Sequence, residues 1–203
     1  MRIVKVIPKV LALSIVLIFP METLASFDFS SDKFVDGGLD RSDSFDLLAG
    51  SELDSHYNNY ADVQITGASY NQVVIDQDGF GSGINKARVI IKSGSSDNNV
   101  YLSQYGSNNT GLISQNGDGN TALLVQSGNG QEGYILQEGD NNLAFLKQQY
   151  KNRRSSSISI EQMNDNNVAL VVDRGGSNYS IKQNGGSKIA VWSSMGRHIS
   201  IEQ

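Results

Sequence analysis

An eleven-residue repeat constrains the fold of this chain more than any other feature of its sequence. Glutamine recurs at four successive intervals of eleven, at Gln104, Gln115, Gln126, Gln137 and Gln148. An Asn or Gln precedes each glutamine by six residues, small or apolar residues alternate between the two, and a glycine follows the first four glutamines by two residues. Because a unit this short cannot bury an apolar face alone, successive units must stack.

The alternation within each unit predicts a β-strand, because side chains of a strand point to opposite faces with a period of two. Two strand-turn units per rung give a β-solenoid with about 22 residues per rung, in which each strand pairs with the strand one rung away. About six such rungs make a body roughly 30 Å long. The predicted fold class is therefore all-β, with one repeat domain over residues 58–203 that is most regular over 98–148.

Repetition of residue identity, and not only of polarity, predicts ladders of side-chain amides inside the solenoid, the arrangement that stabilises cross-β stacks. The residues predicted to form them are Asn98, Gln104, Asn109, Gln115, Asn120, Gln126, Gln137, Asn142, Gln148, Gln162, Asn167, Gln183 and Gln203. Glycine supplies the positive φ of a tight reversal, and the predicted turn glycines are Gly106, Gly117, Gly128 and Gly139. Looser copies of the unit begin at Asn59, Asn71 and Asn85.

Two other structures are compatible with parts of this pattern. An antiparallel meander also gives strands at regular spacing, but it has no reason to repeat the same residue on every strand. Disorder is suggested by composition, because Asn, Gln, Ser and Gly make up 80 of the 203 residues. However, the only prolines are Pro8 and Pro20, and a chain that excludes proline keeps every backbone donor for β-ladders.

The first 25 residues have the pattern of a secretory signal peptide. Arg2, Lys5 and Lys9 precede a largely apolar stretch from Val10 to Phe19, and small residues before Ser26 provide a cleavage site after Ala25. The apolar stretch is shorter than the roughly twenty residues of a membrane span. Cleavage removes Arg2, Lys5, Lys9 and Glu22 and so changes the formal charge of the chain from −5 to −7. This negative charge disfavours a nucleic-acid partner held by overall charge.

Residues 26–57 form an acidic, irregular N-terminal segment. It holds eight Asp or Glu residues against Lys33 and Arg41, with no clean strand or helix period. We interpret it either as a solubilising tail or as an address that a secretion apparatus reads.

The half-repeat resembles the curlin repeat of bacterial curli fibres. The resemblance rests on glutamine followed by Gly two residues later and Asn five residues later, as in Gln115, Gly117 and Asn120. It is strong over 98–148, fair over 155–203, weaker over 58–97 and absent from the acidic segment. It implies a non-enzymatic subunit of extracellular functional amyloid, secreted through a dedicated pore with accessory assembly factors and supporting adhesion and biofilm formation.

Departures from the repeat after Gln148 are similar to those of the minor, nucleating curlin. Asp173 and Ser194 stand at expected ladder positions, and Tyr179 and Trp192 at expected inward small positions. An ionised Asp in a dry ladder costs several kcal/mol unless it is paired. We therefore expect the regular rungs around 98–148 to template the major subunit through an unpaired strand edge.

The C-terminal part is basic, with eight cations against four acids over residues 147–203. We expect it to face the outer membrane or an accessory factor. The candidate surface-attachment residues are Lys151, Arg153, Arg154, Arg174, Lys182, Lys188 and Arg197. A solvated turn that discourages lateral association is the alternative for Arg153 and Arg154.

Other functions remain as alternatives to a nucleating subunit. The chain could be a major curlin-type subunit or a non-polymerising secreted solenoid adhesin. Outward apolar residues on one half of the rung, such as Leu123, Phe145 and Leu170, could line a contact between protofilaments or stand as scattered surface residues. With no Cys, two His and no catalytic motif, the sequence predicts no enzyme, no metal site and no cofactor.

Overall fold

The computed structural model describes residues 59–79, 83–149, 155–174, 176–194, 196 and 198–203, together with the backbone of residues 3–8. These residues form strands and turns, and no helix among them is long and apolar enough to cross a membrane. The acidic segment 26–57 and the loop 151–154 lie outside the described residues, as does the predicted signal peptide apart from residues 3–8.

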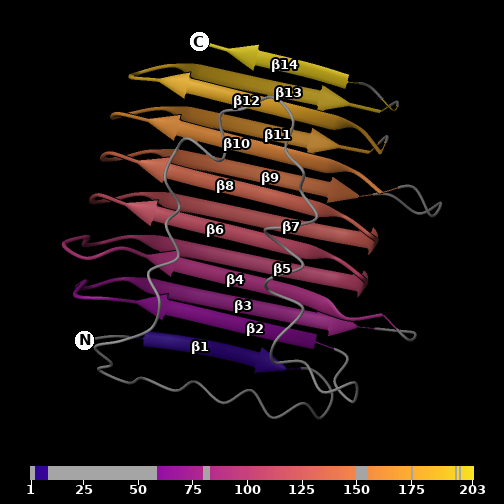
Figure 1. Ribbon diagram of the computed structural model, residues 1–203, viewed down its shortest axis with the longest axis horizontal. Coiled ribbons are helices and arrows are strands. Elements are labelled where there is room, and N and C mark those ends of the chain that lie inside the picture. The colour runs from indigo at the N-terminus through magenta and orange to yellow at the C-terminus, as the bar shows by residue number, and fades with distance from the viewer. Residues whose placement is uncertain are drawn as a thin grey trace, which may run out of the picture. The chain divides into compact units, whose positions relative to one another are not determined.

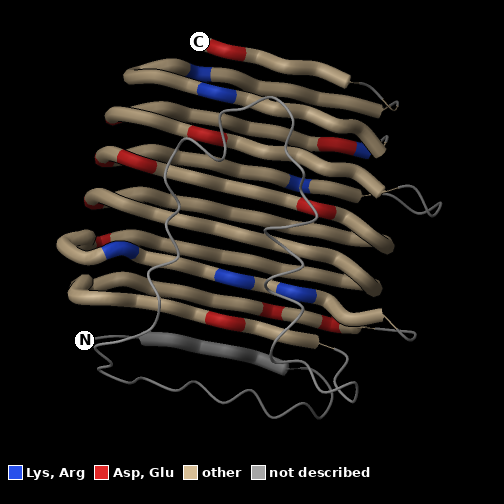
Figure 2. The backbone as a smooth tube through the Cα atoms, in the orientation of Figure 1, with Lys and Arg blue, Asp and Glu red and all other residues tan. Residues whose placement is uncertain are grey.

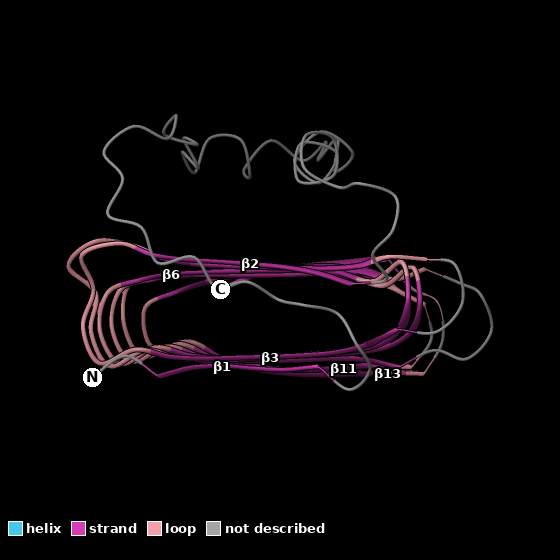
Figure 3. Ribbon diagram, turned by 90° about the horizontal axis from the view of Figure 1, so that it is seen from below, coloured by secondary structure: helices cyan, strands magenta, loops and turns pink. Residues whose placement is uncertain are grey.

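The strands form two parallel sheets of seven strands each, and the chain alternates between them (Figures 1 and 3). Sheet A consists, in spatial order, of β1 (Ile3–Pro8), β3 (Gln72–Gly79), β5 (Asn99–Ser107), β7 (Thr121–Asn129), β9 (Leu143–Gln149), β11 (Val168–Asp173) and β13 (Lys188–Ser193). Sheet B consists of β2 (Asn59–Ile65), β4 (Asn85–Ile91), β6 (Thr110–Asn116), β8 (Glu132–Glu138), β10 (Ser157–Met163), β12 (Asn178–Asn184) and β14 (His198–Glu202).

This architecture is the predicted β-solenoid, and the antiparallel meander is wrong. In the regular middle of the stack the pairing joins residues 22 apart, as in Gln104 with Gln126 and Gln115 with Gln137. The spacing is wider at the start, where Gln77 pairs with Gln104. The corner loops therefore absorb the irregular spacing, and the strands keep their register.

The core lies between the two sheets and consists of stacked small and branched apolar side chains. Ala122 and Ala144 pair in sheet A, and Ile113 and Ile135 pair in sheet B. All four are at most 2% exposed. Because every second residue of each strand points into this space, each rung contributes a thin layer that is closed only by the rungs above and below it.

Two of the positions predicted near the C-terminus are wrong. Asp173 pairs with Ser193, so Ser193 and not Ser194 stands in register with the ladder position. Trp192 is 74% exposed and points outward, whereas Val191 packs against the core. A regular spacing of eleven from Gln183 gives position 194, but the turn between β12 and β13 is one residue shorter. A shift of one residue exchanges the two faces of a strand.

Tyr179 does point inward, where it is 1% exposed, and its hydroxyl is buried with no hydrogen-bond partner among the described residues. We expect Tyr179→Phe to raise the free energy of unfolding by about 1 kcal/mol, because it removes an unsatisfied buried polar group. Denaturant unfolding followed by circular dichroism measures this change. Tyr70→Phe, at a side chain that is 70% exposed, is the control and should have no effect. A loss of stability in Tyr179→Phe would contradict the expectation.

Candidate functional site

A column of glutamines runs through the interior of sheet A. Nε2 of Gln77 donates to Oε1 of Gln104 at 2.6 Å. Nε2 of Gln104 donates to Oε1 of Gln126 at 2.8 Å, and Gln126 in turn donates to Gln148 at 3.1 Å. All four side chains are buried. Each amide therefore points the same way along the stack, and the column has a donor end and an acceptor end.

A second column of glutamines runs through sheet B with the same polarity. Nε2 of Gln115 donates to Oε1 of Gln137 at 2.8 Å. Gln137 donates to Gln162, and Gln162 to Gln183, both at 2.9 Å. Each rung is thus joined to the following one between Gln77 and Gln148 in sheet A and between Gln115 and Gln183 in sheet B.

The same glutamines also tie the two sheets together. Nε2 of Gln126 donates to the carbonyl oxygen of Thr110 in β6 at 2.9 Å. Nε2 of Gln137 donates to the carbonyl oxygen of Thr121 in β7 at 3.1 Å. Both amide hydrogens of a ladder glutamine are therefore used, one along the stack and one across it, which satisfies polar groups that would be costly to bury alone.

Asparagines hold the corners between successive rungs. Oδ1 of Asn98 accepts from the backbone N–H of Asn120 at 2.8 Å, while Nδ2 of Asn98 donates to the carbonyl oxygen of Gly117 at 2.8 Å. Asn120 repeats both contacts with Asn142 and Gly139. Asparagine suits this position because its short side chain presents one acceptor and one donor to two backbone groups of the next rung.

The four predicted turn glycines all have positive φ, between 113° and 130°. Gly106 and Gly128 lie within the last residues of β5 and β7, and Gly117 and Gly139 directly follow β6 and β8. A Cβ on Gly106 would overlap the carbonyl oxygen of Gly128, and a Cβ on Gly117 would overlap that of Gly139. Close stacking of the rungs therefore requires glycine here in addition to the backbone conformation.

The ladders extend beyond the residues predicted for them. Asn71, Gln77, Asn85 and Gln131 are buried in the same columns or corners, and Asn85 accepts from the side chain of Asn109 at 3.0 Å. The looser units that begin at Asn71 and Asn85 contain the same pattern of amide residues, but their unequal spacing makes it less regular than in the later units.

The ladder of sheet A stops at β11. Asp173 follows Gln148 in register and Ser193 follows Asp173, so neither position presents an amide. Asp173 is 1% exposed, and its carboxylate accepts from the backbone N–H of Ser177 at 3.1 Å. In sheet B, the predicted ladder residue Gln203 lies past β14 with an exposed side chain, because no described rung follows it.

The hypothesis that the regular rungs offer an unpaired edge is wrong. Each strand from β5 to β9 has hydrogen-bonded neighbours on both sides. Among the described strands, the edges of the sheets lie at β2 and β14 in sheet B and at β1 and β13 in sheet A. β1, which falls within the predicted signal peptide, pairs with β3 over Gln72–Gln77.

The basic residues predicted for surface attachment do not share one face. Lys182 lies on the outer face of sheet B, 3.5 Å from Glu161. Arg174 and Lys188 belong to the outer side of sheet A, where the Arg174 guanidinium lies 5.9 Å from the ring centre of Trp192. Figure 2 shows that most of the strand backbone carries uncharged residues. The remaining candidates, Lys151, Arg153, Arg154 and Arg197, lie outside the described residues.

Over the described ranges, no three acidic or histidine side chains converge as ligands of a metal ion. Aspartates at equivalent positions of successive turns accept hydrogen bonds from backbone N–H groups instead. Oδ1 of Asp118 accepts from the N–H of Ser96, and Oδ1 of Asp140 from that of Asp118, at 2.7 and 2.8 Å. Their carboxylates thus serve as turn caps.

These features define a structural repeat protein, a parallel β-solenoid whose rungs are joined by buried amide ladders. Residues 96–126 and 120–149 match the family model of the curlin associated repeat. The two matches overlap and span about a quarter of the chain, from β5 to β9. No curated protein matches the chain significantly. Curlin associated repeats on a β-solenoid fit a structural subunit of extracellular, curli-type amyloid.

Proposed function

We propose that this chain is the minor subunit of a curli-type fibre, which nucleates polymerisation of a major curlin at the bacterial surface and so supports adhesion and biofilm formation. The observation that carries the proposal is that the amide ladder of sheet A reaches the first rung at β3 but is interrupted before the last rung at β13. A subunit that polymerises head to tail with itself needs two complementary ends, whereas a nucleator needs one end that recruits and one that does not.

The end formed by β2 and β3 is the recruiting end. The sheet A ladder is intact here, and Nε2 of Gln77 already donates to Gln104. No donor among the described residues approaches Oε1 of Gln77, so an incoming glutamine amide extends the column. Among the described strands, β2 pairs only with β4, and its outer backbone groups accept a further parallel strand.

Signal-peptide cleavage after Ala25 completes this end. It removes β1 and leaves the backbone of β3 without its neighbour. The mature chain then presents two adjacent strand edges, one from each sheet, together with the acceptor end of the sheet A ladder. The chain before cleavage presents only one of these edges.

The end formed by β13 and β14 is the non-recruiting end. Asp173 and Ser193 interrupt the ladder of sheet A. The inward residues of the last strands, such as Val191 and Ile201, are only partly buried. A further rung added here meets no amide column in sheet A, which leaves this end for attachment to the outer membrane or to an accessory factor.

Seeding of a purified major curlin tests the proposal. The mature chain, added in substoichiometric amount, is expected to shorten the lag before thioflavin fluorescence appears. Gln77→Lys should abolish this effect, because it places a cation at the acceptor end of the ladder. Gln203→Lys, at the exposed opposite end, is the matched control and should seed like the unaltered chain.

Circular dichroism of both variants shows whether the solenoid is intact before seeding is compared. If the unaltered chain leaves the lag unchanged, the chain is not a nucleator. If only Gln203→Lys abolishes seeding, the recruiting end is the one formed by β13 and β14. A 4.7 to 4.8 Å cross-β reflection from the seeded fibres should accompany a shortened lag.

A further inference from the structure

The outer face of sheet A carries a continuous apolar column. Outward positions in register on successive strands are occupied by Val74, Tyr101, Leu123, Phe145, Leu170 and Ala190. Tyr101 and Leu170 are 38% and 42% exposed. A run of apolar side chains across six strands is unusual on a surface that faces only water.

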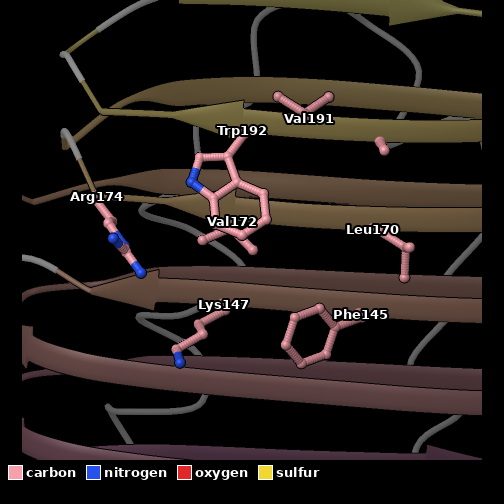
Figure 4. A pocket seen from close by; sticks show the side chains of 8 residues that line it. Phe145, Lys147, Leu170, Val172, Arg174, Val191 and Trp192 are labelled. Carbon is pink, nitrogen blue, oxygen red and sulfur yellow. The ribbon is translucent and has the colours of Figure 1, made fainter.

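Near β13 this column widens into a groove of about 350 Å³ (Figure 4). Its apolar wall includes Phe145, Leu170 and Val172, and Trp192 covers one side of it. Lys147 and Arg174 stand at its margin. The groove is thus apolar in its floor and cationic at its rim.

Charge on this face is divided between its two ends. Asp76 and Asp78 point outward from β3, while Lys147 and Lys188 belong to β9 and β13 and Arg174 directly follows β11. None of these five forms an ion pair with another described residue. By contrast, the ion pairs of the described residues lie on the sheet B side, as in Arg88 with Asp62 at 3.3 Å. These five charged side chains of sheet A are therefore available for ion pairs with another molecule.

We propose that the outer face of sheet A binds the same face of a second copy of this chain, with the two solenoids stacked in opposite directions. A twofold axis along the strands of β7 sets β3 of one copy against β11 of the other, and β5 against β9. Asp78 then faces Arg174 of the second copy, and Asp76 lies beside Lys147 of the second copy. A parallel arrangement would set acid against acid and base against base.

In this arrangement, side chains of the second copy fill the groove. Tyr101 lies on Phe145 of the second copy, Val74 on its Leu170, and the two Leu123 side chains meet at the axis. Five strands spaced by about 4.8 Å, each contributing about six residues at 3.3 Å, give a patch of roughly 480 Å² per copy. This size is at the lower end of specific interfaces, and the dimer is weak and concentration-dependent.

This lateral contact is independent of growth at the strand edges. Copies that stack end to end keep equivalent residues about one solenoid length apart, roughly 30 Å, and their sheet faces stay free. Lateral pairing therefore joins two stacks that grow in opposite directions, and it is separable from seeding by experiment.

Cross-linking of the full-length chain tests the contact, and the natural absence of Cys makes the labelling clean. Facing sheets lie about 10 Å apart, too far for a direct disulfide, so Leu123→Cys is treated with a short bismaleimide. Covalent dimer is expected from this variant. Ser180→Cys, on the outer face of sheet B, is the matched control and should give little dimer.

Charge reversal then tests the orientation. Asp78→Arg in the Leu123→Cys background should lower the dimer yield about tenfold, and adding Arg174→Asp should restore it. Both sites point outward, and circular dichroism checks that the fold is kept. Equal yields from Leu123→Cys and Ser180→Cys would overturn the contact. An unchanged or increased yield in Asp78→Arg would overturn the antiparallel arrangement.

Discussion

Gln148→Leu is expected to lower the free energy of unfolding by about 3 to 5 kcal/mol. Nε2 of Gln148 donates to the carbonyl oxygen of Glu132 and to Oγ of Ser156, both at 2.8 Å. Oε1 of Gln148 accepts from Gln126 at 3.1 Å. Leucine fills similar space but removes the acceptor that Gln126 uses along the stack and the donor that Glu132 and Ser156 use, and each buried polar group that loses a partner costs about 1 to 3 kcal/mol.

The neighbouring residue provides the control. Gln149 has the same side chain and the same strand, but it points to the outer face and is only half-buried. Gln149→Leu should therefore change the free energy of unfolding by less than about 0.5 kcal/mol. Denaturant titration followed by circular dichroism compares the two variants. Equal losses would mean that the ladder contributes no more than a surface amide does.

Gly106→Ala is expected to be the second severe change, lowering the free energy of unfolding by about 3 kcal/mol or more. Gly106 has a φ of 120°, a conformation that residues with a Cβ rarely adopt. The added methyl group would also overlap the carbonyl oxygen of Gly128 in the next rung. Relief of that overlap requires β5 and β7 to separate, which breaks the hydrogen bonds between them.

Gly94→Ala separates the two causes of that loss. Gly94 also has a positive φ, of 83°, but a Cβ there meets nothing within 4 Å. Its replacement should cost only the conformational penalty of about 1 kcal/mol. Thermal and denaturant unfolding of the two variants measure the difference. If the two losses match, rung stacking does not require glycine at position 106.

Sequence reasoning worked best where the repeat is most regular. The eleven-residue spacing of Gln104, Gln115 and Gln126 predicts both the strand alternation and the 22-residue rung, and the structure has that rung. It failed where loop length changes. At β13 the turn is one residue short, and the expected inward position of Trp192 became an outward one. Within a strand the period is fixed by the backbone, whereas its phase depends on the preceding loop.

The sequence by itself determined the fold class, the rung length and the kind of side chain that fills each column, because in a stacked repeat every residue meets copies of itself. Only the tertiary structure decided the shared direction of the two glutamine ladders, the ends at which strands remain unpaired, and the division of charge on the outer face of sheet A. These properties arise from the order in which rungs are stacked. The acids of β3 are about 90 residues or more away in the chain from Lys188 of β13 and from Arg174, which directly follows β11, and only stacking places them on one surface.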